Sequence, residues 1–148
     1  MKEVMHILNE PGEYDAKTRS YMALALARFE GEEVGRALRA ALEEETEPEV
    51  LINILWALGL KKDAASVDLI LPFLQRNEEE LRKTAVYVLG AIGETKAVPA
   101  IEPLLADASQ DVRWNTATSL ARLSSDAGYG TLVKMLDRDT LKASASLS

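Results

Sequence analysis

The segment Glu80-Leu81-Arg82 recurs along the chain at a fixed interval, as Glu49-Val50-Leu51 before it and Asp111-Val112-Arg113 after it. The interval is 31 residues in both directions (81 − 50 and 112 − 81). Within this frame, residues at helical spacing read Val50, Ile54 and Leu58, then Leu81, Ala85 and Leu89, then Val112, Thr116 and Leu120. Each set forms one stripe along a helix. The interval therefore predicts a repeat architecture built from helices.

A second stripe follows the first in every unit. It reads Ile70-x-x-Phe73-Leu74, Ile101-x-x-Leu104-Leu105 and Leu132-x-x-Met135-Leu136, in the same frame. Leu38-x-x-Ala41-Leu42 fits an earlier unit if the connection from Glu43 to Glu49 holds one extra residue, and the first helix of that unit then presents Met22, Leu26 and Phe29. Val4-x-x-Ile7-Leu8 has the form of a second helix without a first, and Asp139-Thr140-Leu141-Lys142 resembles the start of another first helix.

The sequence thus predicts an all-α, right-handed α-solenoid of stacked antiparallel helix pairs, with about four pairs and terminal half-repeat helices. A single domain is expected over residues 1–148. The expected boundaries are an N-terminal half-repeat helix at 1–12, helix pairs at 13–45, 46–76, 77–107 and 108–138, and a C-terminal partial helix at 139–148.

Small residues and prolines follow the same frame. Gly59, Gly90 and Ala121 come directly after the third stripe position, where a larger side chain would hold neighbouring helices apart. Pro72 and Pro103 are expected to interrupt and bend the second helices, because proline removes a backbone hydrogen bond. Thr46 and Asn77 precede Glu49 and Glu80 by three residues, which predicts capping boxes at the first helices.

Composition narrows the classes of function. The 148 residues carry a formal net charge of −7 and no cysteine. No segment gathers Lys or Arg into a stripe, so nucleic acid is not expected as a partner. Without thiols, neither a disulfide nor a thiolate metal site can form. No apolar run approaches the roughly 20 residues that span a bilayer, and the amino terminus lacks the features of a signal peptide, so a soluble, cytoplasmic protein without membrane partners is expected.

The strings that carry this frame resemble a known family. Leu89-Gly90-Ala91-Ile92-Gly93 after Glu80-Leu81-Arg82, and the run from Ala97 to Leu105, are similar to the short HEAT-like repeats named for phycobilisome lyases. The resemblance covers nearly the whole chain, although Leu51 stands where the other units have Arg82 and Arg113. It implies that the second helices line a concave face and the first helices a convex face, and it leaves the function open.

Residues with catalytic or metal-binding chemistry do not form a recognisable constellation. His6 is the single histidine, and Glu3 and Glu10 near it make a weak metal site, so no metal is expected. The acidic runs at Glu43 and Glu78 lie at helix ends, where solvated faces and helix-dipole stabilisation explain them. We therefore expect a non-enzymatic protein that needs no cofactor.

The second-helix face offers columns of small and apolar residues rimmed by mixed charge. The candidate binding residues on this concave face are Arg36, Asp68, Leu69, Pro72, Arg76, Ala100, Pro103 and Lys134, with Thr131, Asp107 and Arg138 beside them. Such a face suits an extended peptide or a partner helix. The alternative is a plain solvated groove, because single exposed apolar residues are normal.

The first-helix face carries aromatic residues in columns, namely Ile52, Lys83 and Trp114, and Trp56, Tyr87 and Thr118. Aromatic residues are enriched at interface hot spots, so Ile52, Trp56, Tyr87 and Trp114 could form a convex contact patch. Alternatively, Trp56 fills a gap between repeats within the core.

The leading hypothesis is a scaffold that holds a protein or peptide on its concave face. A second hypothesis follows only from the family resemblance, namely an accessory subunit or chaperone of a chromophore lyase. A third is a segment of a longer solenoid, or a homo-oligomer joined through open ends. The oligomeric state stays open.

Overall fold

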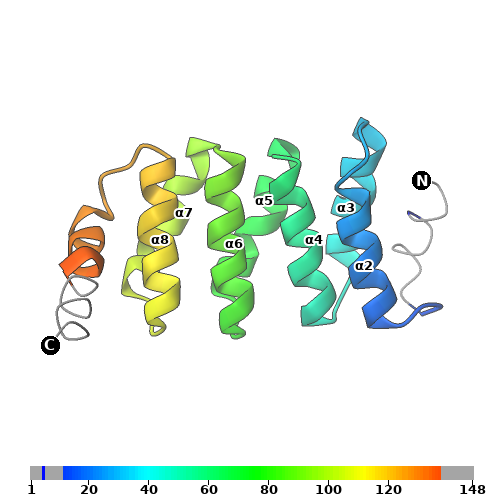
Figure 1. Cartoon of the computed structure of the whole chain (residues 1–148), viewed down its shortest axis with the longest axis horizontal. Coiled ribbons are helices and arrows are strands. Elements are labelled where there is room, and N and C mark those ends of the chain that lie inside the picture. The colour runs from blue at the N-terminus through cyan, green and yellow to red at the C-terminus, as the bar shows by residue number, and fades with distance from the viewer. Residues whose placement is uncertain (1–4, 6–11, 138–148) are drawn as a thin grey trace, which may run out of the picture.

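The computed structural model describes Met5 and residues 12–137, which form two rows of helices (Figure 1). One row holds the first helices of the pairs, α2 (Ala16–Leu26), α4 (Pro48–Leu60), α6 (Glu79–Ile92) and α8 (Gln110–Arg122). The other row holds α3 (Glu32–Glu44), α5 (Val67–Ile70) and α7 (Val98–Ile101), and a last helix over residues 129–137 follows α8. No strand occurs in this part of the chain.

The first helices stand side by side in chain order, and α3, α5 and α7 lie behind them (Figure 1). This arrangement confirms the prediction of an all-α solenoid of stacked helix pairs. The helices α2 and α3 fall within 13–45, and the later pairs begin at Pro48, Glu79 and Gln110. Apart from Met5 and Gly12, the predicted terminal helices at 1–12 and 139–148 lie outside the described residues, as do His6 and Arg138.

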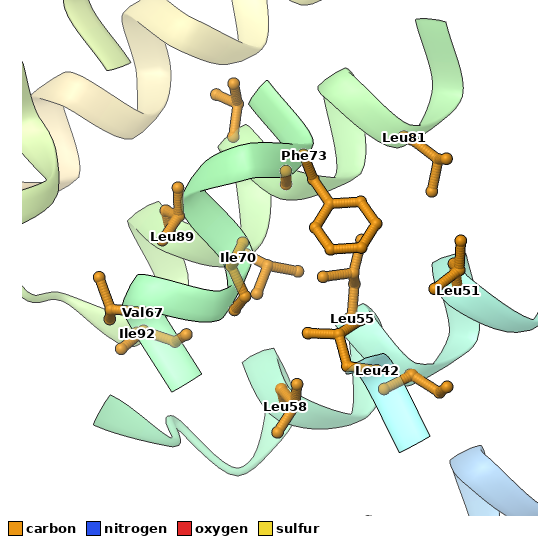
Figure 2. Packing of buried hydrophobic residues seen from close by; sticks show 14 of the residues in the cluster. Leu42, Leu51, Leu55, Leu58, Val67, Ile70, Phe73, Leu81, Leu89 and Ile92 are labelled. Atoms are coloured by element: carbon orange, nitrogen blue, oxygen red, sulfur yellow. The ribbon is translucent and has the colours of Figure 1, made fainter. Parts of the chain in front are cut away.

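A continuous apolar core runs between the two rows. Figure 2 shows it around the second pair, where Leu55 and Leu58 of α4 meet Ile70 and Phe73 of the second helix, with Leu89 of α6 beside them. Full burial of a Leu, Ile or Phe side chain contributes roughly 1.5–3 kcal/mol. Each helix pair therefore depends on its neighbours for stability, as expected for a solenoid.

Gly59 and Gly90 allow consecutive first helices to approach closely, as the sequence predicted. A Cβ at Gly59 would lie 3.1 Å from Cγ2 of Val88 in α6, and a Cβ at Gly90 would lie 2.6 Å from Oγ of Ser119 in α8. Val88 and Ser119 are themselves 31 residues apart (119 − 88), so the same contact occurs in two successive units.

Pro72 and Pro103 change the hydrogen bonding of the second helices. Each is the second residue of a 3₁₀ segment, η2 (Leu71–Gln75) or η4 (Glu102–Ala106), that continues directly from α5 or α7. Short 3₁₀ segments also precede these helices, as η1 (Ala64–Ser66) and η3 (Thr95–Ala97). The second helix of the first pair, α3, contains no proline and is continuous. The predicted interruption is therefore present and takes the form of a switch to 3₁₀ geometry.

A left-handed residue ends three of the first helices. Lys62, Gly93 and Ser124 have φ of 50°, 86° and 62°, and they too are 31 residues apart. The residue after Lys62 is Asp63, whose N–H donates to the carbonyl of Leu58. The residue after Ser124 is Ser125, whose N–H donates to the carbonyl of Leu120. This is the hydrogen bond of a Schellman motif, in which glycine is the residue of least strain. Only the unit with Gly93 has glycine there.

The predicted capping boxes are wrong by one residue. The N-cap residues of α4 and α6 are Glu47 and Glu78, not Thr46 and Asn77, and neither makes a side-chain capping bond. In the fourth pair Ser109 occupies the same frame position, and its Oγ accepts the N–H of Val112 at 3.3 Å.

Two residues assigned to apolar stripes are exposed. The helix α2 ends at Leu26, which leaves Phe29 in the following turn with 41% of its surface exposed. Leu136 of the last helix is 68% exposed. Both lie in the outer units, where a repeat has fewer neighbours to cover it.

Candidate functional site: the second-helix groove

An open groove lies between the second helices of the second and third pairs. Its volume is about 570 Å³. It is lined on one side by Asp68, Leu71, Pro72, Leu74 and Gln75, and on the other by Ala100, Pro103 and Leu104. We call this surface the second-helix groove.

Four of the residues predicted from sequence line this groove, namely Asp68, Pro72, Ala100 and Pro103. Leu71 and Gln75 were not predicted as groove residues, and Leu74 and Leu104 were expected in the core alone. The signal was available, since positions 68, 71, 72 and 75 follow the i, i+3, i+4, i+7 spacing of one helix face. Leu74 and Leu104 are buried and also form the apolar floor.

The other predicted residues lie elsewhere. Leu69 is half-buried and packs against the core. Arg76 follows Gln75 at the end of η2 and is half-buried. Arg36 on α3 and Lys134 on the last helix are exposed but do not line the groove, so the predicted set does not form one continuous site.

Arginines of the first helices tie together the connections at one edge of the stack. The guanidinium of Arg82 donates to the carbonyls of Arg76 and Asn77 in the connection before α6, at 2.9 and 2.8 Å. It also donates to Asp107, in the connection after η4, at 2.9 and 3.1 Å. Arg19 binds Tyr14 and Glu45 in the same manner. We call this arrangement the arginine clamp. The clamp of Arg82 holds the ends of η2 and η4, the two segments that line the groove.

The clamp lowers the pKa of both acidic partners. Burial opposes the ionisation of Asp107, but hydrogen bonds from Arg82 and from the N–H of Ser109 outweigh it, so the pKa lies below the ordinary value. Burial likewise opposes ionisation of Glu45, and bonds from Arg19 and the N–H groups of Glu47 and Thr46 hold its pKa low. Asp107 therefore has a structural role and is not an open part of the binding rim.

The second pair departs from this pattern. Leu51 replaces the clamp arginine, and Arg76 stands at the frame position of Glu45 and Asp107. The Arg76 guanidinium instead pairs with Glu78 at 2.5 Å and lies 5.6 Å from the centre of the Phe73 ring. Arg76 is therefore held by a half-exposed ion pair that a partner carboxylate can exchange at little cost. At the other end of the groove, the exposed Asp68 carboxylate lies 3.3 Å from the Lys96 ammonium.

The aromatic residues of the first-helix face partly join the core. Trp56 is half-buried against the core, and its ring lies 4.9 Å from that of Tyr87, centre to centre. Tyr87 keeps 38% of its surface exposed, while Ile52 and Trp114 are half-buried. Trp56 thus packs between two repeats, and Tyr87, which its ring contacts, stays exposed on the first-helix face.

Among the described residues, no group of three or more His, Cys, Asp or Glu side chains is arranged to hold a metal ion. Of the described helices, none combines the length and the apolar character needed to cross a bilayer.

Comparison with known proteins agrees with this architecture. The family model for HEAT repeats matches residues 35–121 and 67–147. The crystal structure of an engineered protein, a Northeast Structural Genomics Consortium target, is similar to the chain with a TM-score of 0.62 and 20% sequence identity, over 90% of this chain and 68% of the other. No curated protein matches the sequence. The matched residues, the 31-residue frame and the paired helices show that the chain belongs to the HEAT repeat family.

Proposed function

We propose that the protein is a non-enzymatic scaffold that binds an extended segment of a protein partner in the second-helix groove. The observation that carries this proposal is the groove itself, which brings Pro72 and Pro103 of successive repeats to its two sides above an apolar floor. The arginine clamp supports it, because a rigid surface loses little entropy on binding.

The chemistry of the groove favours a segment with apolar side chains between polar ends. Leu71, Leu74 and Leu104 offer apolar contacts, and Gln75 can hydrogen-bond the backbone of an extended chain. Asp68 and Arg76 lie before and after the groove residues of η2 and carry opposite charges. Each forms a surface ion pair, with Lys96 and Glu78 respectively, that a charged group of a partner can replace. These charges would set the direction of the bound segment.

A pair of matched lysine substitutions tests the groove. Ala100→Lys places a charged chain in the groove, while Ala65→Lys adds the same charge at an exposed position outside it. Position 65 corresponds to Lys96 in the next repeat (96 − 65 = 31), so the control residue suits the fold. A photo-crosslinker at Gln75 would identify the bound segment, and Ala100→Lys should abolish that crosslink while Ala65→Lys retains it. Equal crosslinking in both variants would rule out the groove.

Charge reversal distinguishes binding at the groove from binding elsewhere on the second-helix face. Arg76 directly follows the groove residue Gln75, so Arg76→Glu should weaken binding of the crosslinked partner. Arg36→Glu and Lys134→Glu should have smaller effects, because α3 and the last helix contribute no residue to the groove. All three variants should keep the helical circular dichroism signal. Unchanged binding with Arg76→Glu would show that its charge does not recognise the partner.

The narrower hypothesis of an accessory subunit for a chromophore lyase rests on the resemblance of the repeats from Glu80 to Leu105 alone. A linear tetrapyrrole, or a protein that carries one, would then occupy the groove and be lost with Ala100→Lys. An end-to-end array stays a prediction that sedimentation can test, and exposed Tyr129 and Val133 on the last helix are the residues to substitute if self-association is found.

A further inference from the structure

A separate hollow lies on the first-helix face, away from the second-helix groove. Its volume is about 220 Å³. It is lined by Trp56, Gly59 and Leu60 of α4, Lys62 just after α4, Tyr87, Val88 and Ala91 of α6, and Arg122 of α8. Three consecutive repeats therefore contribute to it. We call it the first-helix pocket.

Repetition of the sequence frame builds the walls of this pocket. Trp56 and Tyr87 are equivalent residues of successive repeats and lie at 53° to each other. The Arg122 guanidinium lies over the Tyr87 ring, 5.4 Å from its centre. Gly59 and Ala91 leave space between the helices, so the aromatic rings border a hollow.

The pocket continues as an apolar track toward the first pair. Leu60, which is 70% exposed, also lines a neighbouring hollow with Tyr21, Leu24 and Arg28 of the α2 region. Leu24 occupies the frame position of Trp56, and Arg28 that of Leu60. Both offsets are 32 (56 − 24 and 60 − 28), which is the 31-residue interval plus the one extra residue in the connection from Glu43 to Glu49. The first-helix face thus carries an exposed apolar strip with a cation at each end.

Three cations beside this strip have no ion-pair partner among the described residues. Within residues 12–137, none of Arg28, Lys62 and Arg122 forms an ion pair. The chain as a whole has a net charge of −7, so three unpaired cations on one apolar strip are a local reversal of sign. A cation next to an exposed aromatic surface favours a ligand that is apolar and negatively charged.

Lys62 lies at a helix end that three repeats share. Its left-handed conformation, with φ of 50°, is also that of Gly93 and Ser124 at the same frame position. Because Gly93 has no side chain, Lys62 supplies a cation at the pocket that the next repeat lacks at this position.

The volume limits the occupant. At about 220 Å³ the pocket is smaller than the roughly 300–1,000 Å³ of small-molecule sites, and it suits one large apolar side chain. We propose that the first-helix pocket binds an acidic linear segment of a protein partner, which inserts an aromatic or leucine side chain between Tyr87 and Leu60 and places flanking carboxylates beside Lys62 and Arg122. This interface is distinct from the second-helix groove, so the scaffold would hold two partner segments on opposite rows of helices.

Synthetic peptides test this proposal directly. The probe is a fluorescein-labelled, end-blocked hexapeptide of sequence Asp-Glu-Leu-Phe-Asp-Glu, followed by fluorescence anisotropy in about 0.15 M salt, where charges are screened beyond about 8 Å. One control peptide replaces the central pair by Ala-Ala, and another replaces the acids by Asn and Gln. We expect the acidic apolar probe to bind at least tenfold more tightly than either control.

Variants of the protein locate the binding. Lys62→Gln combined with Arg122→Gln removes both charges from exposed positions and should weaken probe binding at least tenfold, while the melting curve stays cooperative. Tyr87→Ala should weaken it through loss of the aromatic wall. The groove variant Ala100→Lys should bind the probe with unchanged affinity, which separates this site from the proposed function. No binding at millimolar probe, equal affinity for the control peptides, or equal affinity of the double variant would each overturn the proposal.

Discussion

Replacement of Gly90 by alanine tests whether close approach of the first helices determines the stack. A Cβ at this position would lie 2.6 Å from Oγ, 2.8 Å from Cβ and 3.0 Å from Cα of Ser119. The Cα belongs to the backbone of α8, so a change of side-chain rotamer cannot remove the clash. The helices α6 and α8 must separate, or Ser119 must give up the 2.8 Å hydrogen bond from its Oγ to the carbonyl of Val86.

Two opposing effects set the magnitude. Alanine stabilises a helix interior by about 1 kcal/mol relative to glycine. Overpacking of a tight interface costs roughly 1–3 kcal/mol, and the contact with backbone puts Gly90 in the upper part of that range. The net expectation for Gly90→Ala is a loss of about 1–2 kcal/mol in the free energy of unfolding, or a melting temperature lower by roughly 2–8 °C.

Gly59→Ala is the matched control. Its added Cβ would lie 3.1 and 3.2 Å from the two methyl groups of Val88, which can move by a few tenths of an ångström. The gain in helix propensity then offsets the contact, and the stability should change by less than about 0.5 kcal/mol. Urea unfolding followed by circular dichroism measures both variants. If Gly90→Ala is as stable as the wild type, or if Gly59→Ala loses more, the close approach of α6 and α8 does not have the energetic importance assigned to it.

Three further outcomes are expected from the core, the clamp and the helix ends. Leu104→Ala should lower the free energy of unfolding by roughly 2–3 kcal/mol, at the low end for a buried leucine because the residue also borders the groove; no measurable change would contradict the repeat register. Arg82→Met should cost about 1–3 kcal/mol at neutral pH by leaving the Asp107 carboxylate without its partner. The pKa of Asp107 is lowered in the folded state, so its stabilisation is present above the ordinary pKa near 4 and is lost as pH falls through the folded value. Urea titrations should therefore show that the difference in unfolding free energy between Arg82→Met and the wild type narrows below about pH 4. A difference that stays constant with pH would mean that the ion pair does not lower the pKa of Asp107. Lys62→Gly should raise the melting temperature through about 0.5–1 kcal/mol of relieved strain, and Gly93→Ala should lower it by a similar amount; opposite signs would show that the left-handed helix ends carry no strain.

Repetition in the sequence predicted much of this structure. The stripes from Val50 to Leu120 indicated the first helices, and the small residues at 59 and 90 indicated where those helices meet. The predicted N-caps of α4 and α6 were one residue too early, because Glu47 and Glu78 resemble first-turn acids as readily as N-cap residues. Phe29 was placed on a helix because its apolar character fits the stripe, although α2 ends before it.

The candidate sites were harder to predict because they depend on neighbours in different repeats. Asp68, Pro72, Ala100 and Pro103 were identified as columns, and Leu71 and Gln75 share a helix face with Asp68 and Pro72. The sequence alone did not show that this face lies opposite Ala100 and Pro103 of the next repeat. Arg122 was not identified at all. It lies one turn beyond Thr118, the residue in the column of Trp56 and Tyr87, and its long side chain reaches back to the Tyr87 ring.

By itself, the sequence determined the fold class and the register of the repeats, because apolar stripes at a fixed interval can be buried only by pairing helices and stacking the pairs. The tertiary structure decided which surface residues act together. Charge and aromatic character are visible residue by residue, but a groove or a pocket requires side chains of separate helices to lie within a few ångströms. That proximity depends on the close contact at Gly59 and Gly90, on the 3₁₀ turns at Pro72 and Pro103, and on the arginine clamp.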